Sequence, residues 1–326
     1  GVGHQSLTNA SGNAYGVAVG YQAGYARDEC DFTVDIGYRA GHSSTNSHQN
    51  INLGYDAGRA NNNHTYSSNI GYEAGYSSEY IEYSVSHGYQ AGYDCAGNEK
   101  VVAIGYKSML TTNNNHRVTA IGWNAGVSMS GVQNSAFLGE YAGRNIQLGS
   151  GLFSMGDSSF DQATLSSGCV AFGDNAGDSI VSIQNSILMG VFAGYQSVDS
   201  YECIGIGTHA LNTASGNTYS VDIGWFAGDT AKNNSRSINI GNQAGGDTVD
   251  NYSTISIGDR ASSNLNDSNH GINIGGLAGS SGDYGIAIGA SAGFGATSNA
   301  SINIGYWTGR SRSGANSLII RAGTES

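Results

Sequence analysis

The sequence predicts an all-β protein that folds as a parallel β-solenoid of about 19 coils with a 17-residue repeat. Three observations carry this prediction: a glycine recurs at every seventeenth position from Gly3 to Gly275, aliphatic residues alternate with other residues before it, and no segment has a helical spacing of apolar residues. Seventeen residues are too few for a strand and a crossover helix, so each repeat is expected to form one coil that stacks on the next.

The recurring glycines are expected to bend the chain, because a Cβ atom would obstruct the turn there. After Gly275 the next glycines of the series are Gly289 and Gly305, so the spacing becomes shorter than in the regular repeat. The sequence therefore divides into a regular solenoid over residues 1–279 and irregular C-terminal coils over residues 280–326. The glycines singled out as structural turns are Gly20, Gly37, Gly54, Gly71, Gly88, Gly105, Gly122, Gly224, Gly241 and Gly275.

One short strand per repeat is predicted just before the glycine. Residues 34–36, Val-Asp-Ile, are typical, and such period-two alternation places the two aliphatic side chains on one face. We expect the aliphatic residues to face the core and the residue between them to face water. On this assignment, Ile223→Ala is expected to cost about 2 to 5 kcal/mol. The alanine three residues after the glycine, such as Ala40, is expected to face inward, and polar segments such as residues 42–50 are expected to form exposed loops.

Composition and charge exclude several classes of function. The chain has 51 Gly, no Pro, and 13 Lys plus Arg against 25 Asp plus Glu, which gives a net charge of −12 without a basic cluster. A nucleic-acid partner is therefore not expected. Membrane insertion is not expected either, because no run of 18 apolar residues occurs.

Cysteine spacing predicts that the four cysteines form no intrachain disulfide. Cys169 and Cys203 share a column but lie two coils apart. Their Cα atoms would be about 9.6 Å apart, whereas a disulfide needs less than about 7 Å. Asp157, Asp174 and Asp259 share another column, where solvated charges are expected in preference to a metal site.

No catalytic motif is recognisable. The chain lacks G-x-S-x-G, H-E-x-x-H and P-loop strings, and its eight His residues do not gather at ligand spacing. We therefore expect a protein that is not an enzyme and uses no cofactor or metal.

Two segments, GHQSLTNASGNAYGVAVGYQAG at residues 3–24 and GTHALNTASGNTYSVDIGWFAG at residues 207–228, resemble a known repeat class. They are similar to the Gly-Tyr-x-Ala-Gly repeats of bacteriophage tail fibres and, more distantly, to the heads of trimeric autotransporter adhesins. The resemblance extends over nearly the whole chain. It implies a left-handed β-roll, a side-by-side homotrimer, an extracellular or virion-surface location, and a role in host attachment.

An aromatic column follows the glycine on seven consecutive repeats. One interpretation is a platform for the sugar rings of a cell-surface glycan; the other is a self-stacking ladder or a subunit interface. The column consists of Tyr21, Tyr38, Tyr55, Tyr72, Tyr89, Tyr106 and Trp123.

The leading hypothesis is a structural fibre or adhesin, a rigid repeat rod for attachment to a host cell or surface. The alternative is a self-assembling extracellular matrix or surface filament, whose open coil ends would stack end to end. In both hypotheses the chain has copies of itself as partners. Ice binding is a weaker candidate, because it calls for an even Thr column and no column in the sequence is one.

Overall fold

The computed structural model describes residues 1–12, 15–265, 268–279, 283–297, 299–311 and 316–321. The predicted fold class is confirmed: the described residues form a parallel β-solenoid with nineteen short strands and no helix. Accordingly, nothing in the described part of the chain is a helix of the length and hydropathy that a membrane span needs. The chain divides into two compact units, residues 1–164 and 165–326.

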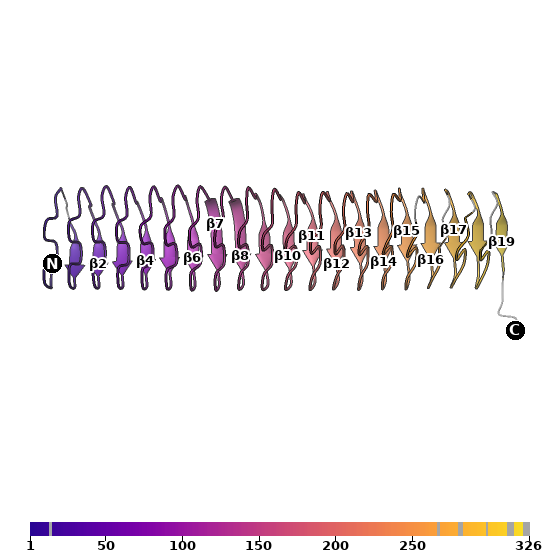
Figure 1. The fold of residues 1–326 in the computed structure, drawn as a ribbon, viewed down its shortest axis with the longest axis horizontal. Helices are drawn as coiled ribbons and strands as arrows, with labels where there is room; N and C mark the ends of the chain where they lie inside the picture. The colour runs from indigo at the N-terminus through magenta and orange to yellow at the C-terminus, as the bar shows by residue number, and fades with distance from the viewer. Residues whose placement is uncertain (13–14, 266–267, 280–282, 298, 312–315, 322–326) are drawn as a thin grey trace. The chain divides into compact units, whose positions relative to one another are not determined.

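Strands in each unit stack in chain order, as the arrows in Figure 1 show. The first unit contains β1 (Val17–Val19), β2 (Val34–Ile36), β3 (Ile51–Leu53), β4 (Ser68–Ile70), β5 (Val85–His87), β6 (Val102–Ile104), β7 (His116–Ile121), β8 (Gln133–Leu138) and β9 (Phe153–Met155). The second contains β10 (Val170–Phe172), β11 (Ile187–Met189), β12 (Ile204–Ile206), β13 (Val221–Ile223), β14 (Ile238–Ile240), β15 (Ile255–Ile257), β16 (Ile272–Ile274), β17 (Ile286–Ile288), β18 (Ile302–Ile304) and β19 (Leu318–Ile320).

Strand register reproduces the sequence period. In the first unit, Val34 of β2 lies opposite Ile51 of β3, so the strand offset equals the glycine spacing of the regular repeat. In the second unit, Ile272 lies opposite Ile286, and Ile286 lies opposite Ile302, so the strand offsets shorten together with the glycine spacing. The strands thus stay aligned where the glycine spacing changes, because it is the segments between the strands that are shorter there.

The polar segments expected to be loops are regular sides of the coil, so that expectation was wrong. Within residues 42–50, every third side chain is buried: Ser44, Ser47 and Asn50 are 4%, 2% and 3% exposed. Residues between them form parallel bridges to the next coil, such as Thr45 with Asn62. The backbone turns at left-handed residues spaced three apart, a conformation in which Asn and Gly are tolerated better than most residues.

The strand faces are the reverse of the expectation. The middle residue of each three-residue strand points inward, as Asp35 and Asn239 do at 0% and 3% exposure, whereas Ile36 and Ile238 are 39% and 37% exposed. Ile223 is likewise an outward, half-buried residue. A 17-residue coil encloses a narrow interior, which small and short polar residues mostly fill; large inward side chains such as Phe137 and Leu188 have small residues at the same position in the coils before and after them.

Two glycine columns make this narrow coil possible. Gly54 has a φ of +141°, and a Cβ atom there would lie 2.1 Å from the carbonyl oxygen of Gly71 in the next coil. Gly58 has a φ of +61°, and its Cβ would lie 1.9 Å from Oδ1 of the inward Asn52 side chain. The first column therefore permits close stacking of the bends, and the second leaves space for the inward strand residue. All ten singled-out turn glycines have φ between +129° and +143°.

The alanine column faces inward, as predicted. Every member of it is completely buried: Ala23, Ala40, Ala57, Ala74, Ala91, Ala125, Ala142, Ala176, Ala193, Ala227 and Ala244. The four cysteines are also buried in the interior, and none is in a disulfide.

Candidate functional site

The aromatic column of the first unit is a continuous ladder of stacked rings. Tyr38 and Tyr55 have ring centroids 4.8 Å apart and planes 7° apart, and the other tyrosine pairs of the column lie at 4.9 to 5.1 Å and 4 to 10°. Trp123 closes the series 4.2 Å from Tyr106, at 21°. Each ring follows a bend glycine at the end of a strand, so the parallel pairing of the strands brings successive rings together.

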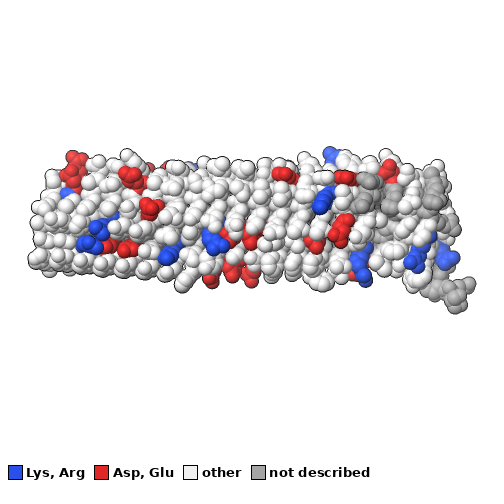
Figure 2. Space-filling model, viewed as in Figure 1, with Lys and Arg blue, Asp and Glu red and all other residues white. Residues whose placement is uncertain are grey.

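In several coils, the residue that directly follows the ring in the sequence is charged, and its side chain lies beside the ladder. The guanidinium of Arg39 lies 5.0 Å from the Tyr38 ring centroid, and it donates two hydrogen bonds to the buried Asp56 carboxylate, at 3.0 and 2.8 Å. The nearby Glu73 carboxylate raises the pKa of the Tyr72 phenol, chiefly through its negative charge. Figure 2 shows charged groups scattered over the face in view, without a continuous basic patch.

Ring orientation separates the two interpretations of the ladder. Near-parallel rings about 5 Å apart cover one another's faces, and their edges and hydroxyl groups remain in solvent. Tyr21, Tyr38, Tyr55, Tyr72 and Tyr89 are accordingly 40 to 42% exposed. A sugar platform needs exposed ring faces, so this geometry favours the stacking ladder.

In each unit, the outward positions of the strands form a second surface, which we call the aliphatic face. In a three-residue strand the face comprises the first and third residues, and in the longer β7 and β8 it comprises the corresponding two of the last three residues. Among these positions in β1 to β19, only Ser68, His87 and Thr119 are polar. The sequence analysis missed this surface because it placed these side chains in the core. A signal for the correct orientation was present: small residues recur at every third position along the rest of each repeat, where they line a narrow interior. Members of the face that are 36 to 50% exposed include Val17, Val19, Ile36, Ile51, Ile70, Ile104, Ile121, Ile187, Met189, Ile206, Ile238, Ile240, Ile257, Ile274 and Ile288.

The interior of the first unit contains a chain of polar contacts. Arg27 and Asp35 are 1% and 0% exposed and form an ion pair at 2.7 Å. Asn52 donates a hydrogen bond to Asp35 at 2.8 Å, and Asn69 donates one to Asn52 at the same distance. Burial raises the pKa of Asp35, and the Arg27 charge opposes that shift. These residues occupy inward positions that the sequence analysis had assigned to solvent or to loops.

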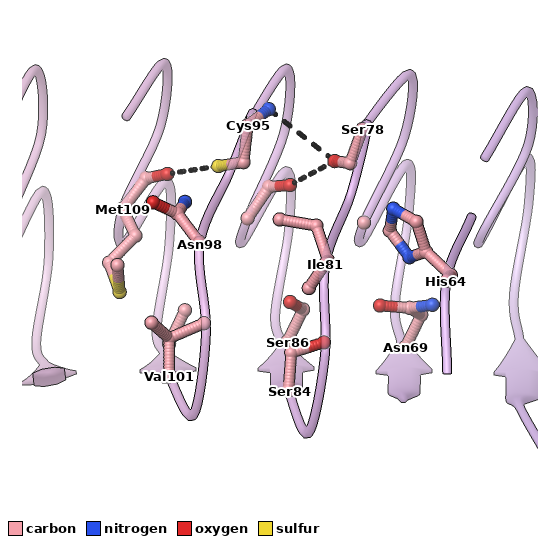
Figure 3. Close-up of a pocket in the computed structure, with 13 residues that line it drawn as sticks. His64, Asn69, Ser78, Ile81, Ser84, Ser86, Cys95, Asn98, Val101 and Met109 are labelled. Carbon is pink, nitrogen blue, oxygen red and sulfur yellow. Dashed lines mark hydrogen bonds between the residues drawn. The ribbon is translucent and has the colours of Figure 1, made fainter. Parts of the chain in front are cut away.

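A small cavity inside the first unit lies among His64, Asn69, Ser84, Ser86 and Ile81, as Figure 3 shows. Its volume is about 10 Å³, which is enough for roughly one water molecule and too small for an organic substrate. His64 is 1% exposed, and neither of its ring nitrogens has a hydrogen-bond partner in the described structure. Burial lowers the pKa of His64 to about 4, so the imidazole is neutral at pH 7.

Acidification is expected to destabilise the first unit through His64. The pKa is about 4 in the folded chain against an ordinary 6.5, so the unfolded chain binds the proton more tightly. The contribution of neutral His64 is therefore complete above pH 6.5 and is lost as the pH falls toward 4, up to about 3 kcal/mol. Denaturant titrations of His64→Asn should show a flatter dependence of unfolding free energy on pH. The control is His116→Asn at a partly exposed position, and an unchanged pH dependence in His64→Asn would contradict the assignment.

A shallow groove of about 380 Å³ occurs in the second unit where the coils shorten. Leu265, Leu277 and Phe294 supply apolar walls, and Arg260 lies at the groove with its guanidinium 3.3 Å from the Asp259 carboxylate. Phe294 is 43% exposed, and the Arg310 guanidinium lies 5.4 Å from its ring centroid.

Metal-ligating side chains are not gathered in the described part of the chain: no group of three or more His, Cys, Asp or Glu residues there is placed to hold a metal ion. In particular, Asp157 and Asp259 are exposed, and neither belongs to such a group among the described residues.

The chain is a β-solenoid protein: its parallel coils stack on one another, a column of glycines forms the bends, and the aromatic ladder and the aliphatic face lie on the outside. A scan against protein-family models gives no match, and a search of curated proteins finds no significant relative.

Proposed function

We propose that the chain is a structural fibre or adhesin segment, in which copies pack side by side through the aliphatic face to form a stiff attachment rod. The observation that carries this proposal is the aliphatic face itself, because soluble proteins rarely leave such a large apolar surface uncovered. The resemblance to phage tail fibre repeats supports the same assembly, with three copies as the expected number and the virion or cell surface as its location.

The size of the face suits an interface between protein chains. Full burial of an aliphatic side chain removes roughly 100 Å² from water, so two outward side chains per strand, each about one-third exposed, offer roughly 70 Å². The nine strands of residues 1–164 then offer on the order of 600 Å², and residues 165–326 offer a similar area. A standard interface buries about 800 Å² on each partner.

A second copy of the chain is the occupant that matches this surface best. The face has no charged side chain, so it offers nothing to an ionic partner. Within a unit its side chains repeat at the strand spacing, so an identical face can match it strand by strand along that unit.

Lysine on the aliphatic face is expected to weaken self-association. Ile240 is 37% exposed on β14, and Ile240→Lys would place a charge in the apolar interface without disturbing the interior. We expect association to weaken at least about tenfold, which corresponds to about 1.4 kcal/mol, as measured by sedimentation and light scattering. The matched control is Asn233→Lys, which adds the same charge at an exposed position off the face. Equal association of both variants would contradict the interface.

Attachment needs a receptor contact, and we place it at the groove of Leu277 and Phe294 in the second unit. An apolar wall beside an arginine suits a sugar ring that carries polar substituents. Phe294→Ala should reduce binding to target cells or glycan arrays without changing the mass of the assembly. Loss of assembly in Ile240→Lys and loss of binding in Phe294→Ala test the two parts separately.

Electron microscopy distinguishes this function from the matrix alternative. Discrete rods of fixed length, with the mass of a few chains, support a fibre segment. Filaments that lengthen without limit as the protein concentration rises would favour a self-assembling matrix protein and would overturn the proposal.

A further inference from the structure

The tyrosines of the first unit are held as preformed pairs on successive coils. Five consecutive pairs run from Tyr21 to Tyr106, with centroids 4.8 to 5.1 Å apart and planes no more than 10° apart. Two further pairs lie off the ladder: Tyr66 with Tyr83 at 4.8 Å and 5°, and Tyr76 with Tyr93 at 4.9 Å and 4°. In every pair, the partners are one repeat apart in the sequence. Nothing else in the described structure brings so many oxidisable side chains together.

We propose that these stacked tyrosines are a site of oxidative modification, at which a one-electron oxidant joins successive coils through dityrosine bonds. The inference depends only on the ring geometry, so it stands apart from the attachment function and from the number of chains in the assembly. Its consequence would be a solenoid whose neighbouring coils are covalently fastened along one side.

The chemistry balances with hydrogen peroxide and a haem peroxidase as the oxidant. The ferryl haem takes one electron from each of two tyrosines, and each phenolic proton passes to water. The two phenoxyl radicals join by a carbon–carbon bond between ring carbons ortho to the oxygens. The hydrogen on each joined carbon then moves to its phenolic oxygen, which restores both aromatic rings. The pair loses two electrons and two protons in total, and one hydrogen peroxide accepts them to form two water molecules.

Geometry favours coupling within the chain over coupling between chains. Strand pairing fixes each ring beside its partner, so the effective concentration of the second radical is far above that of a separate molecule. The ring centres of a dityrosine lie slightly closer together than the stacked rings do here, so the backbone needs little movement. Rotation about the Cβ–Cγ bonds turns two stacked rings edge to edge, and the exposed edges of Tyr38 and Tyr55 leave space for this rotation.

Tyr80 provides a control within the same unit. It is 64% exposed, more than any tyrosine of the ladder, but the residues one coil before and after it are Asn63 and Gly97. If exposure alone governed coupling, Tyr80 would react more than any tyrosine of the ladder. If preformed pairing governs it, Tyr80 should form no bond within the chain.

The test is to treat the dilute full chain with peroxidase and hydrogen peroxide, then unfold it, digest it and identify the linked peptides by mass spectrometry. We expect most dityrosine to join residues one repeat apart, including Tyr38–Tyr55 and Tyr66–Tyr83. Tyr55→Phe keeps a ring in the stack but removes the phenol, so it should abolish both bonds of residue 55 and leave Tyr66–Tyr83 intact.

The result that would overturn the proposal is dityrosine found mainly between chains or at Tyr80, or tyrosine oxidised without coupling. Circular dichroism of Tyr55→Phe before oxidation separates loss of a bond from loss of the fold. If the spectrum of Tyr55→Phe differs from that of the unmodified chain, the test is repeated with Tyr66→Phe. In that variant we expect the Tyr66–Tyr83 bond to disappear and the ladder bonds to remain.

Discussion

Replacement of Leu188 by alanine is expected to lower the free energy of unfolding of residues 165–326 by about 2 to 5 kcal/mol. Leu188 is the inward residue of β11, is 2% exposed, and lies among Ile183, Leu211 and Cys203. Its removal leaves a cavity that a coil held by stacked neighbours on both sides cannot readily close. Denaturant titration followed by circular dichroism measures the loss.

The adjacent Ile187 supplies the matched comparison. It lies on the same strand, points outward and is 38% exposed, so Ile187→Ala should cost only about 1.5 kcal/mol in the dissociated chain. The comparison is made at concentrations where light scattering finds single chains, because association would bury Ile187. A larger cost for Ile187→Ala than for Leu188→Ala would mean that the strand faces are reversed.

Replacement of Arg27 by methionine is expected to destabilise the first unit by about 3 to 5 kcal/mol at pH 7. The change leaves the fully buried Asp35 carboxylate without its cation, while the methionine retains much of the arginine side chain's apolar volume. The loss should shrink as the pH is lowered, because protonation of Asp35 removes the unpaired charge. Thermal unfolding at several pH values measures both effects.

The double variant Arg27→Met with Asp35→Asn tests whether charge is the cause. Asparagine already stands at this inward position in the next two coils, as Asn52 and Asn69, which continue the hydrogen-bonded chain. The double variant should therefore recover most of the stability that Arg27→Met loses. If it is as unstable as the single variant, the loss comes from packing around residue 27 and not from the buried carboxylate.

Much of the fold could be predicted from the sequence because its repeat is regular. The spacing of Gly37 and Gly54 predicted the coil length, and the shorter spacing after Gly275 predicted the reduced strand offsets. The inward position of Ala40 followed from its small size beside a glycine. These features depend on local backbone geometry, which residue type and spacing specify directly.

The candidate site was predicted only in part. The aromatic column was identified residue by residue, but its spacing does not say whether faces or edges of the rings meet the solvent. The near-parallel ring planes of Tyr38 and Tyr55 answer that question in favour of edges. The aliphatic face and the buried Arg27–Asp35 pair were both missed, because the strand faces were assigned in reverse and the segment that contains Arg27 was expected to be an exposed loop.

The sequence by itself determined the 17-residue period, the short strand in each repeat, the parallel stacking and the residues that share each column. Only the tertiary structure decided which columns are enclosed. The physical reason is that alternation shows which side chains lie on the same face of a strand, whereas the direction in which the bends close the coil decides which of the two faces is enclosed. The closed coil turns Asn52 and Ala40 inward and leaves Ile51 outside, where it is available to a partner.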